Sequence, residues 1–155
     1  MPERTDVCRR LERLAWLMDN SIPVPGLDYR IGLDGIIGLV PGLGDALGAV
    51  ISSYILSEAA RLGTPRPILL RMVFNIALDA VVGTIPILGD LFDFTWKANL
   101  RNVALLRGYL EKPRKTVAVS RLFIAILVLL VILFAGFLLL ASALLLRWLW
   151  HVVSG

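Results

Sequence analysis

The sequence predicts an all-α membrane protein with two internally duplicated broken-helix repeats and one C-terminal transmembrane helix. Three observations predict this fold class. Residues 122–146 carry no charge, residues 33–45 and 78–90 resemble each other, and 57% of the 155 residues are hydrophobic against 18% charged. Ordinary soluble domains are about half apolar and a quarter charged. The excess therefore favours a chain that faces lipid or a large partner surface.

Residues 1–22 are expected to form an amphipathic N-terminal helix. Val7, Leu11, Leu14 and Met18 recur at spacings of three and four, which places them on one helical face. Such a helix either lies in the membrane interface or packs on the rest of the domain, and the architecture that we predict uses the interfacial position. Because charged residues crowd positions 2–13 with no apolar run behind them, we expect no signal peptide.

The middle of the chain, residues 23–112, is predicted to be a duplicated membrane core. LDGIIGLVPGLGD at 33–45 and LDAVVGTIPILGD at 78–90 agree at seven of 13 positions with an offset of 45 residues. This agreement indicates an internal duplication, with repeats at about 28–62 and 66–111. Each copy could dip into the bilayer as a hairpin or cross it as two short spans, so a multi-pass protein is expected.

Each copy is predicted to be a helix, a break and a second helix. The first helix should end near a central glycine, because the proline three residues later disfavours helix in the residue before it (Gly38 and Pro41; Gly83 and Pro86). The second helices should cover about 45–62 and 90–111. Asp45 and Asp90 would stand at their starts, where a carboxylate can accept from unpaired N–H groups.

Residues 113–155 are predicted to be a C-terminal membrane anchor. The 25 uncharged residues at 122–146, at about 1.5 Å each, are long enough to cross a hydrocarbon core of about 30 Å. Trp148 and Trp150 follow at the position of an aromatic belt. Basic residues are denser before the span than after it, which predicts a cytoplasmic residue 121 and an external C-terminus (Lys112, Arg114, Lys115 and Arg121 before; Arg147 after).

Four aspartates fall at equivalent points of the two copies: Asp34, Asp45, Asp79 and Asp90. Carboxylates at membrane depth are candidates for an ion or proton pathway, and oxygen ligands suit a hard cation, although no metal can be assigned. The alternative is structural: Arg71, Asn75 and Asp79 share one helical stripe, which suits a buried polar seam. We favour the structural interpretation.

A second polar stripe is expected where Asp93, Lys97 and Arg101 recur at spacing four. It is interpreted as a solvated face, with a lipid-headgroup or phosphate contact through Lys97 and Arg101 as the alternative.

The composition excludes several function classes. A net charge of +4 without a basic stripe argues against nucleic-acid binding. With one cysteine and one histidine, no disulfide, CxxC motif or His-rich metal site is expected. The chain carries no GxSxG, HExxH or GxxxxGK[ST] motif, so neither an enzyme nor a cofactor is predicted.

The run LDGIIGLVPGLGD, followed by RMVFNIALDAVVGTIPILGDLFDFTWKANLRNVALL, resembles the DUF4112 family of uncharacterised, mostly bacterial membrane-associated proteins. The resemblance covers roughly residues 11–110 and is most specific at Arg71-Met72, Asn75, Asp79, Ile85–Asp93 and Lys97–Asn102. It departs from the family's IPGT-like form at Val24–Leu27. The resemblance implies a bacterial inner membrane and no established activity.

Two functions remain as predictions. The first is a non-enzymatic membrane protein that acts as an accessory or assembly subunit or as a homo-oligomer, with the lipid bilayer, a membrane protein or a second copy as its partner. The alternative is an ion or proton channel or transporter that uses the paired aspartates.

Overall fold

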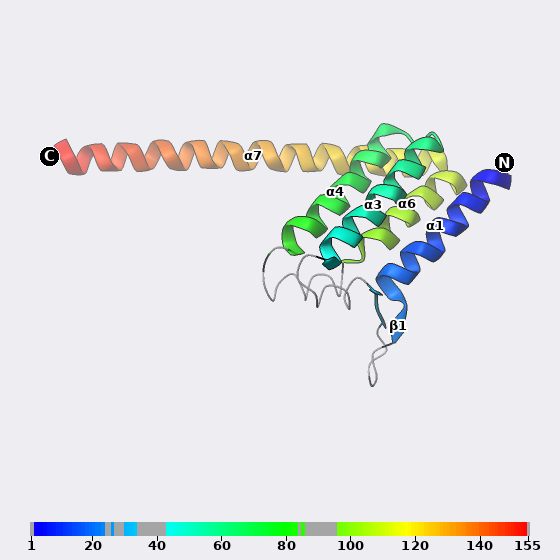
Figure 1. Cartoon of the computed structure of the whole chain (residues 1–155). Helices are drawn as coiled ribbons and strands as arrows, with labels where there is room; N and C mark the ends of the chain where they lie inside the picture. Colours follow the sequence, from blue (N-terminus) through cyan, green and yellow to red (C-terminus); the bar gives the residue numbers. More distant parts are fainter. Residues whose placement is uncertain are drawn as a thin grey trace.

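The computed structural model describes residues 2–23, 26, 30–33, 43–83, 85 and 96–154. Its helices in these ranges are α1 (Pro2–Asn20), α3 (Leu43–Arg61), α4 (Arg66–Gly83), α6 (Ala98–Glu111) and α7 (Pro113–Ser154). The first four lie side by side as a bundle, and α7 crosses one end of it and extends far beyond (Figure 1). The predicted all-α architecture is confirmed.

The core of the bundle lies where α1, α3 and α4 pack around α6. One large apolar side chain from each of these helices is almost completely buried, namely Leu11, Ile55, Ile68 and Leu106. Burying each such side chain contributes about 1.5–3 kcal/mol. The apolar side of α1 takes part in this core through Cys8, Leu11 and Ala15, so α1 packs on the domain rather than presenting that side to a membrane interface.

The turn between α3 and α4 follows from its local sequence. Gly63 adopts a positive φ of 78°, Thr64 N–H donates to Ala59 C=O (3.2 Å), and Gly63 N–H donates to Ala60 C=O (3.0 Å). This pair of bonds is a Schellman motif, which ends a helix at a left-handed glycine. Pro65 then prevents continuation. The chain reverses here, and α4 runs back along α3 to end at Gly83, as the sequence predicts.

The two copies of the duplication differ in structure at their N-terminal ends. Subtracting the 45-residue offset from α4 gives residues 21–38, where an equivalent helix would lie. Within this range, the described residues Ile22–Pro23 (β1) pair antiparallel with Arg30–Ile31 (β2) and form no helix, whereas residues 34–38 lie outside the described part of the chain. Pro23 and Pro25 exclude regular helix there, because proline lacks an N–H and fixes φ. The breaks at Gly38–Pro41 and at Pro86 lie outside the described residues.

The helix expected over residues 90–111 is shorter than predicted. α6 begins at Ala98, because Lys97 adopts a left-handed conformation (φ 46°, ψ 64°) that an α-helix cannot contain. The stripe of Asp93, Lys97 and Arg101 therefore does not share one continuous helix, and Asp93 lies outside the described residues.

The last helix, α7, has two parts. Its first turns pack on α4 and α6, and Ser120 is the last fully covered residue, whereas every residue from Val128 to Trp150 is exposed. Within the described ranges, one helix is long and apolar enough to cross a membrane, and it is this one, over Pro113–Trp150.

Candidate functional site

Buried polar side chains from four helices meet inside the bundle. Each is at most 6% exposed, and they are Asp19 (α1), Ser52 (α3), Asn75 (α4), Asn99 and Asn102 (α6). We call this set the polar seam. Because an unpaired buried polar group costs about 1–3 kcal/mol, such groups are expected to be paired with one another or with the backbone.

One half of the polar seam joins α1, α3 and α6. Ser52 Oγ donates to Asn99 Oδ1 at 2.7 Å, and Asn99 Nδ2 donates to Asp19 Oδ1 at 2.8 Å. The second carboxylate oxygen, Asp19 Oδ2, accepts from Leu100 N–H at 2.8 Å. Asp19 therefore caps the N-terminus of α6 from another helix, a place where an anion is favoured.

The other half joins α4 to α6. Asn75 Nδ2 donates to Asn102 Oδ1 at 2.9 Å, and Asn102 Nδ2 donates to Met72 C=O at 3.3 Å. Trp96 Nε1 donates to Asn75 C=O at 3.2 Å. Asn75, which the sequence places on a polar stripe with Arg71 and Asp79, thus has Asn102 as its hydrogen-bond partner across the helices.

The carboxyl group of Asp19 is only 3% exposed. Burial raises its pKa above the ordinary value, against the hydrogen bonds from Asn99 and Leu100 and the charge of Lys97, which act in the opposite direction. Loss of hydration on burial thus outweighs the favourable contacts in setting the pKa of Asp19.

The two residues predicted to contact lipid headgroups have different positions. Lys97 Nζ donates to Asn20 Oδ1 (2.6 Å) and to Arg30 C=O (2.9 Å), so it ties the end of α1 and β2 to the start of α6. Arg101 stacks 4.0 Å from the centroid of the Trp96 ring and donates through Nε to Trp96 C=O. Arg101 is exposed and lines a groove, whereas Lys97 holds the fold.

Arg71 lies one turn before Asn75 on α4, and both residues line the same groove. The guanidinium of Arg71 sits 4.8 Å from the centroid of Phe123 in α7, and Phe123 packs edge-on against Phe74 at 5.3 Å. Arg71 thus connects α4 to α7 and faces the same groove as Arg101.

Of the four predicted aspartates, the structure describes the side chain of Asp79. Asp34 and Asp90 lie outside the described residues, and Asp45 is in the first turn of α3, with its side chain also outside them. Asp79 is half-buried in α4. In the described ranges, no group of three or more His, Cys, Asp or Glu side chains could hold a metal ion. The ion pathway stays a prediction.

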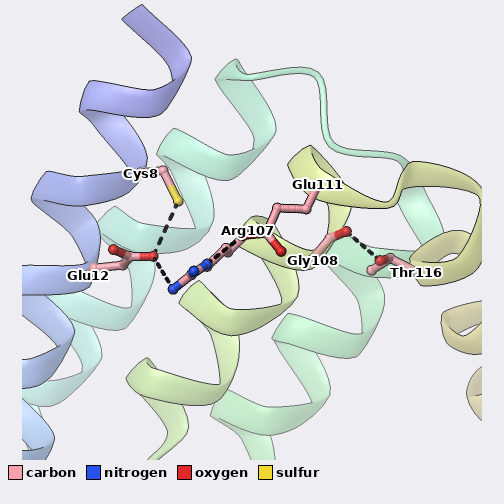
Figure 2. Close-up of polar contacts among 6 residues, drawn as sticks. All are labelled: Cys8, Glu12, Arg107, Gly108, Glu111 and Thr116. Carbon is pink, nitrogen blue, oxygen red and sulfur yellow. Dashed lines mark hydrogen bonds and ion pairs between the residues drawn. The ribbon is translucent and has the colours of Figure 1, made fainter. Parts of the chain in front are cut away.

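A second polar cluster lies at the other end of the bundle (Figure 2). Arg107 pairs with Glu111 at 2.7 Å and with Glu12 at 3.6 Å, and Glu12 also contacts Cys8 Sγ at 4.0 Å. Burial, with the charge of Glu12, raises the pKa of the Cys8 thiol. A thiol of this kind stays protonated near neutral pH and is a poor nucleophile, so the cluster fastens α1 to α6 and offers no reactive group.

The polar seam is saturated by internal partners, which suits a structural role. Sequence reasoning found Asn75 but missed the partners Asp19, Ser52 and Asn102. The spacing of three between Asn99 and Asn102 was the available signal, because two asparagines on one face of a largely apolar helix need buried partners.

The comparisons with known proteins agree with the motifs in this core. The sequence model of DUF4112, a domain of unknown function, matches residues 7–110. The match begins in α1 and ends in α6, so it covers the bundle and the polar seam and stops before α7. No curated protein and no solved structure matches the chain. Since the match spans more than half of the sequence, the chain belongs to the DUF4112 family.

Proposed function

We propose that this protein is a non-enzymatic helical bundle that α7 anchors in a bacterial inner membrane, where it acts as an accessory or assembly subunit or as a homo-oligomer. The observation that supports the proposal is the exposure of α7: all 23 residues from Val128 to Trp150 are exposed, in the one described helix that is long and apolar enough to cross a membrane. Such a surface is far larger than the apolar patches of monomeric soluble proteins, and lipid would cover it.

The charges around α7 support an orientation for this anchor. Basic residues Lys112, Arg114, Lys115 and Arg121 precede the uncharged segment, and Arg147 follows it. The positive-inside rule then favours a cytoplasmic position for residue 121 and an external C-terminus. Membrane insertion of the duplicated segments stays a prediction, because both breaks lie outside the described residues.

The role as a subunit is supported by the outer faces of α3 and α4. Val50 and Tyr54 on α3, and Leu70, Val73 and Val81 on α4, are each at least 44% exposed. Most of them are spaced at i, i+3 or i+4, so each helix keeps an apolar stripe on its outer face in addition to the side that it buries in the bundle. Exposed α1 positions include the arginines Arg9, Arg10 and Arg13, and apolar exposure among the described side chains of this helix is confined to Trp16 and Leu17. We propose that the apolar stripes bind a membrane protein or a second copy.

Photo-crosslinking in native membranes tests this function. A benzophenone amino acid replaces Val50 or Val73 in the full chain, and the same residue replaces the exposed Arg13 of α1 as the matched control. We expect a discrete protein adduct from Val50 and Val73 and none from Arg13. An adduct of twice the chain's mass identifies a second copy, and another mass identifies a partner. Lipid adducts alone would contradict the proposed role.

A further inference from the structure

We propose that the groove between α4, α6 and the start of α7 binds the phosphate of an anionic lipid headgroup. This inference rests on the proposed anchoring by α7 and adds a ligand to it. The groove has a volume of about 430 Å³ and is lined by four basic side chains: Arg71, Arg101, Lys112 and Lys115. This volume lies in the range of small-ligand sites. We call it the basic groove.

The charge of the basic groove is not neutralised within the described part of the chain. None of its four cations forms an ion pair with a described carboxylate within 4.0 Å, and no described acidic residue lines it. The neighbouring Glu111 is engaged by Arg107 at 2.7 Å. Four like charges in one concave site repel each other and attract an anion.

Two of these cations are held in place by aromatic rings. Arg71 sits over Phe123 at 4.8 Å, and Arg101 over Trp96 at 4.0 Å with its Nε bonded to Trp96 C=O. Stacking covers one face of a guanidinium and leaves in-plane N–H groups available. Because a planar guanidinium matches two phosphate oxygens, two fixed arginines can supply geometry, while the exposed Lys112 and Lys115 supply adjustable charge.

The basic groove also lies close to the start of the uncharged segment of α7, near the level at which lipid phosphates are expected. Thr116 Oγ1 donates to Gly108 C=O at 2.7 Å and so fixes the first turn of α7 on α6 (Figure 2). Lys115 precedes Leu122, the start of the uncharged segment, by seven residues, or about 10 Å along a helix. The headgroup region begins at the edge of the hydrocarbon and extends outward by about 5–8 Å. The backbone of Lys115 thus lies just outside this region, and its long flexible side chain can reach back to the lipid phosphates. Arg71 sits over Phe123, the second residue of the uncharged segment, and so lies at the inner edge of the headgroup region.

The decisive experiment measures lipid retention by the purified full chain. Native mass spectrometry of the protein in detergent mixed with phosphatidylglycerol or phosphatidylcholine gives the affinity for each lipid. We expect Arg71→Gln/Arg101→Gln to weaken phosphatidylglycerol binding about tenfold or more, with phosphatidylcholine unchanged. Arg10→Gln/Arg13→Gln removes the same charge from exposed positions on α1 and should leave phosphatidylglycerol binding unchanged.

A second groove variant and three control measurements distinguish loss of lipid binding from loss of folding or of membrane anchoring. Lys112→Gln/Lys115→Gln changes only exposed side chains, so a loss of lipid there supports the proposal even if the arginine variant folds poorly. Equal retention by groove and control variants, or no preference for phosphatidylglycerol over phosphatidylcholine, would overturn it. If inorganic phosphate displaces the lipid and binds with equal affinity, the groove is a site for free phosphate, and the proposed lipid headgroup is contradicted. Alkaline extraction of the groove variants tests the anchor independently. If these variants stay in the membrane but retain less lipid, the groove binds lipid while α7 still anchors the chain.

Discussion

At the scale of single residues, the asparagines of the polar seam determine how neighbouring helices align, because each amide needs a hydrogen-bond partner on another helix. Asn75 donates a hydrogen bond to Asn102 across the α4–α6 contact, and Asn99 links Ser52 to Asp19 across three helices. Leucine could fill the same volume, but an amide is satisfied only when its partner faces it. The seam therefore fixes the relative position of the helices more strictly than apolar packing does.

The buried Asp19 should make the stability of the protein depend on pH. Its pKa is raised in the folded state, so the folded state holds the proton more tightly than the unfolded state does. The contribution of Asp19 to the free energy of unfolding therefore falls as pH rises from about 4, the ordinary carboxyl value, to the raised pKa, and is constant above it. Urea unfolding of the full chain in detergent, compared with Asp19→Asn, measures this difference.

The matched control for Asp19 is Asp6→Asn, an exposed carboxylate on the same helix that lies 3.9 Å from Arg9. Its difference from the wild type should show no such decline with rising pH. The free energy of unfolding of the wild type minus that of Asp19→Asn is compared across pH. If this difference stays constant or increases with pH, the raised pKa of Asp19 is contradicted.

At the scale of elements, two glycines of the α3 region should respond in opposite ways to alanine. Gly63 has φ +78° at the end of α3, Gly48 is inside α3, and an added Cβ meets nothing within 4 Å at either position. The effects are therefore conformational. Gly63→Ala should lower the free energy of unfolding by about 1 kcal/mol, and Gly48→Ala should raise it by about 0.5–1 kcal/mol.

Thermal unfolding of both variants in the same detergent checks this pair, each serving as the control for the other. A rise in stability for Gly63→Ala would contradict a left-handed glycine in the α3–α4 turn, and a fall for Gly48→Ala would contradict the propensity argument for α3.

At the scale of the whole molecule, the anchor should depend on the uncharged segment alone. Leu130→Lys/Leu138→Lys places two charges in the exposed part of α7, each costing about 2.5 kcal/mol or more at the centre of a bilayer. We expect the full chain to stay in the membrane pellet after alkaline carbonate and this variant to be released. Ala118→Lys, exposed before the uncharged segment, should behave as the wild type; release of neither variant would refute α7 as the anchor.

Local rules explain what the sequence determined by itself. The uncharged run, the ends of α3 and α4 near Gly63 and Gly83, and the family motifs depend on residues close together in the chain. Glycine, proline and hydrophobic periodicity act over a few residues and can be recognised without knowing the partners. The helical spacing of Arg71, Asn75 and Asp79 likewise predicts a polar stripe on α4 without knowledge of its partners.

The tertiary structure decided the features that join distant residues. Asp19 meets Asn99 across 80 positions, and Lys97 reaches Arg30 across 67. Packing of distant helices likewise turns the apolar side of α1 against the bundle and places Arg71 with Arg101 in one groove. Each depends on a partner that local pattern cannot supply, since burial and charge balance are properties of the packed helices and not of any segment taken alone.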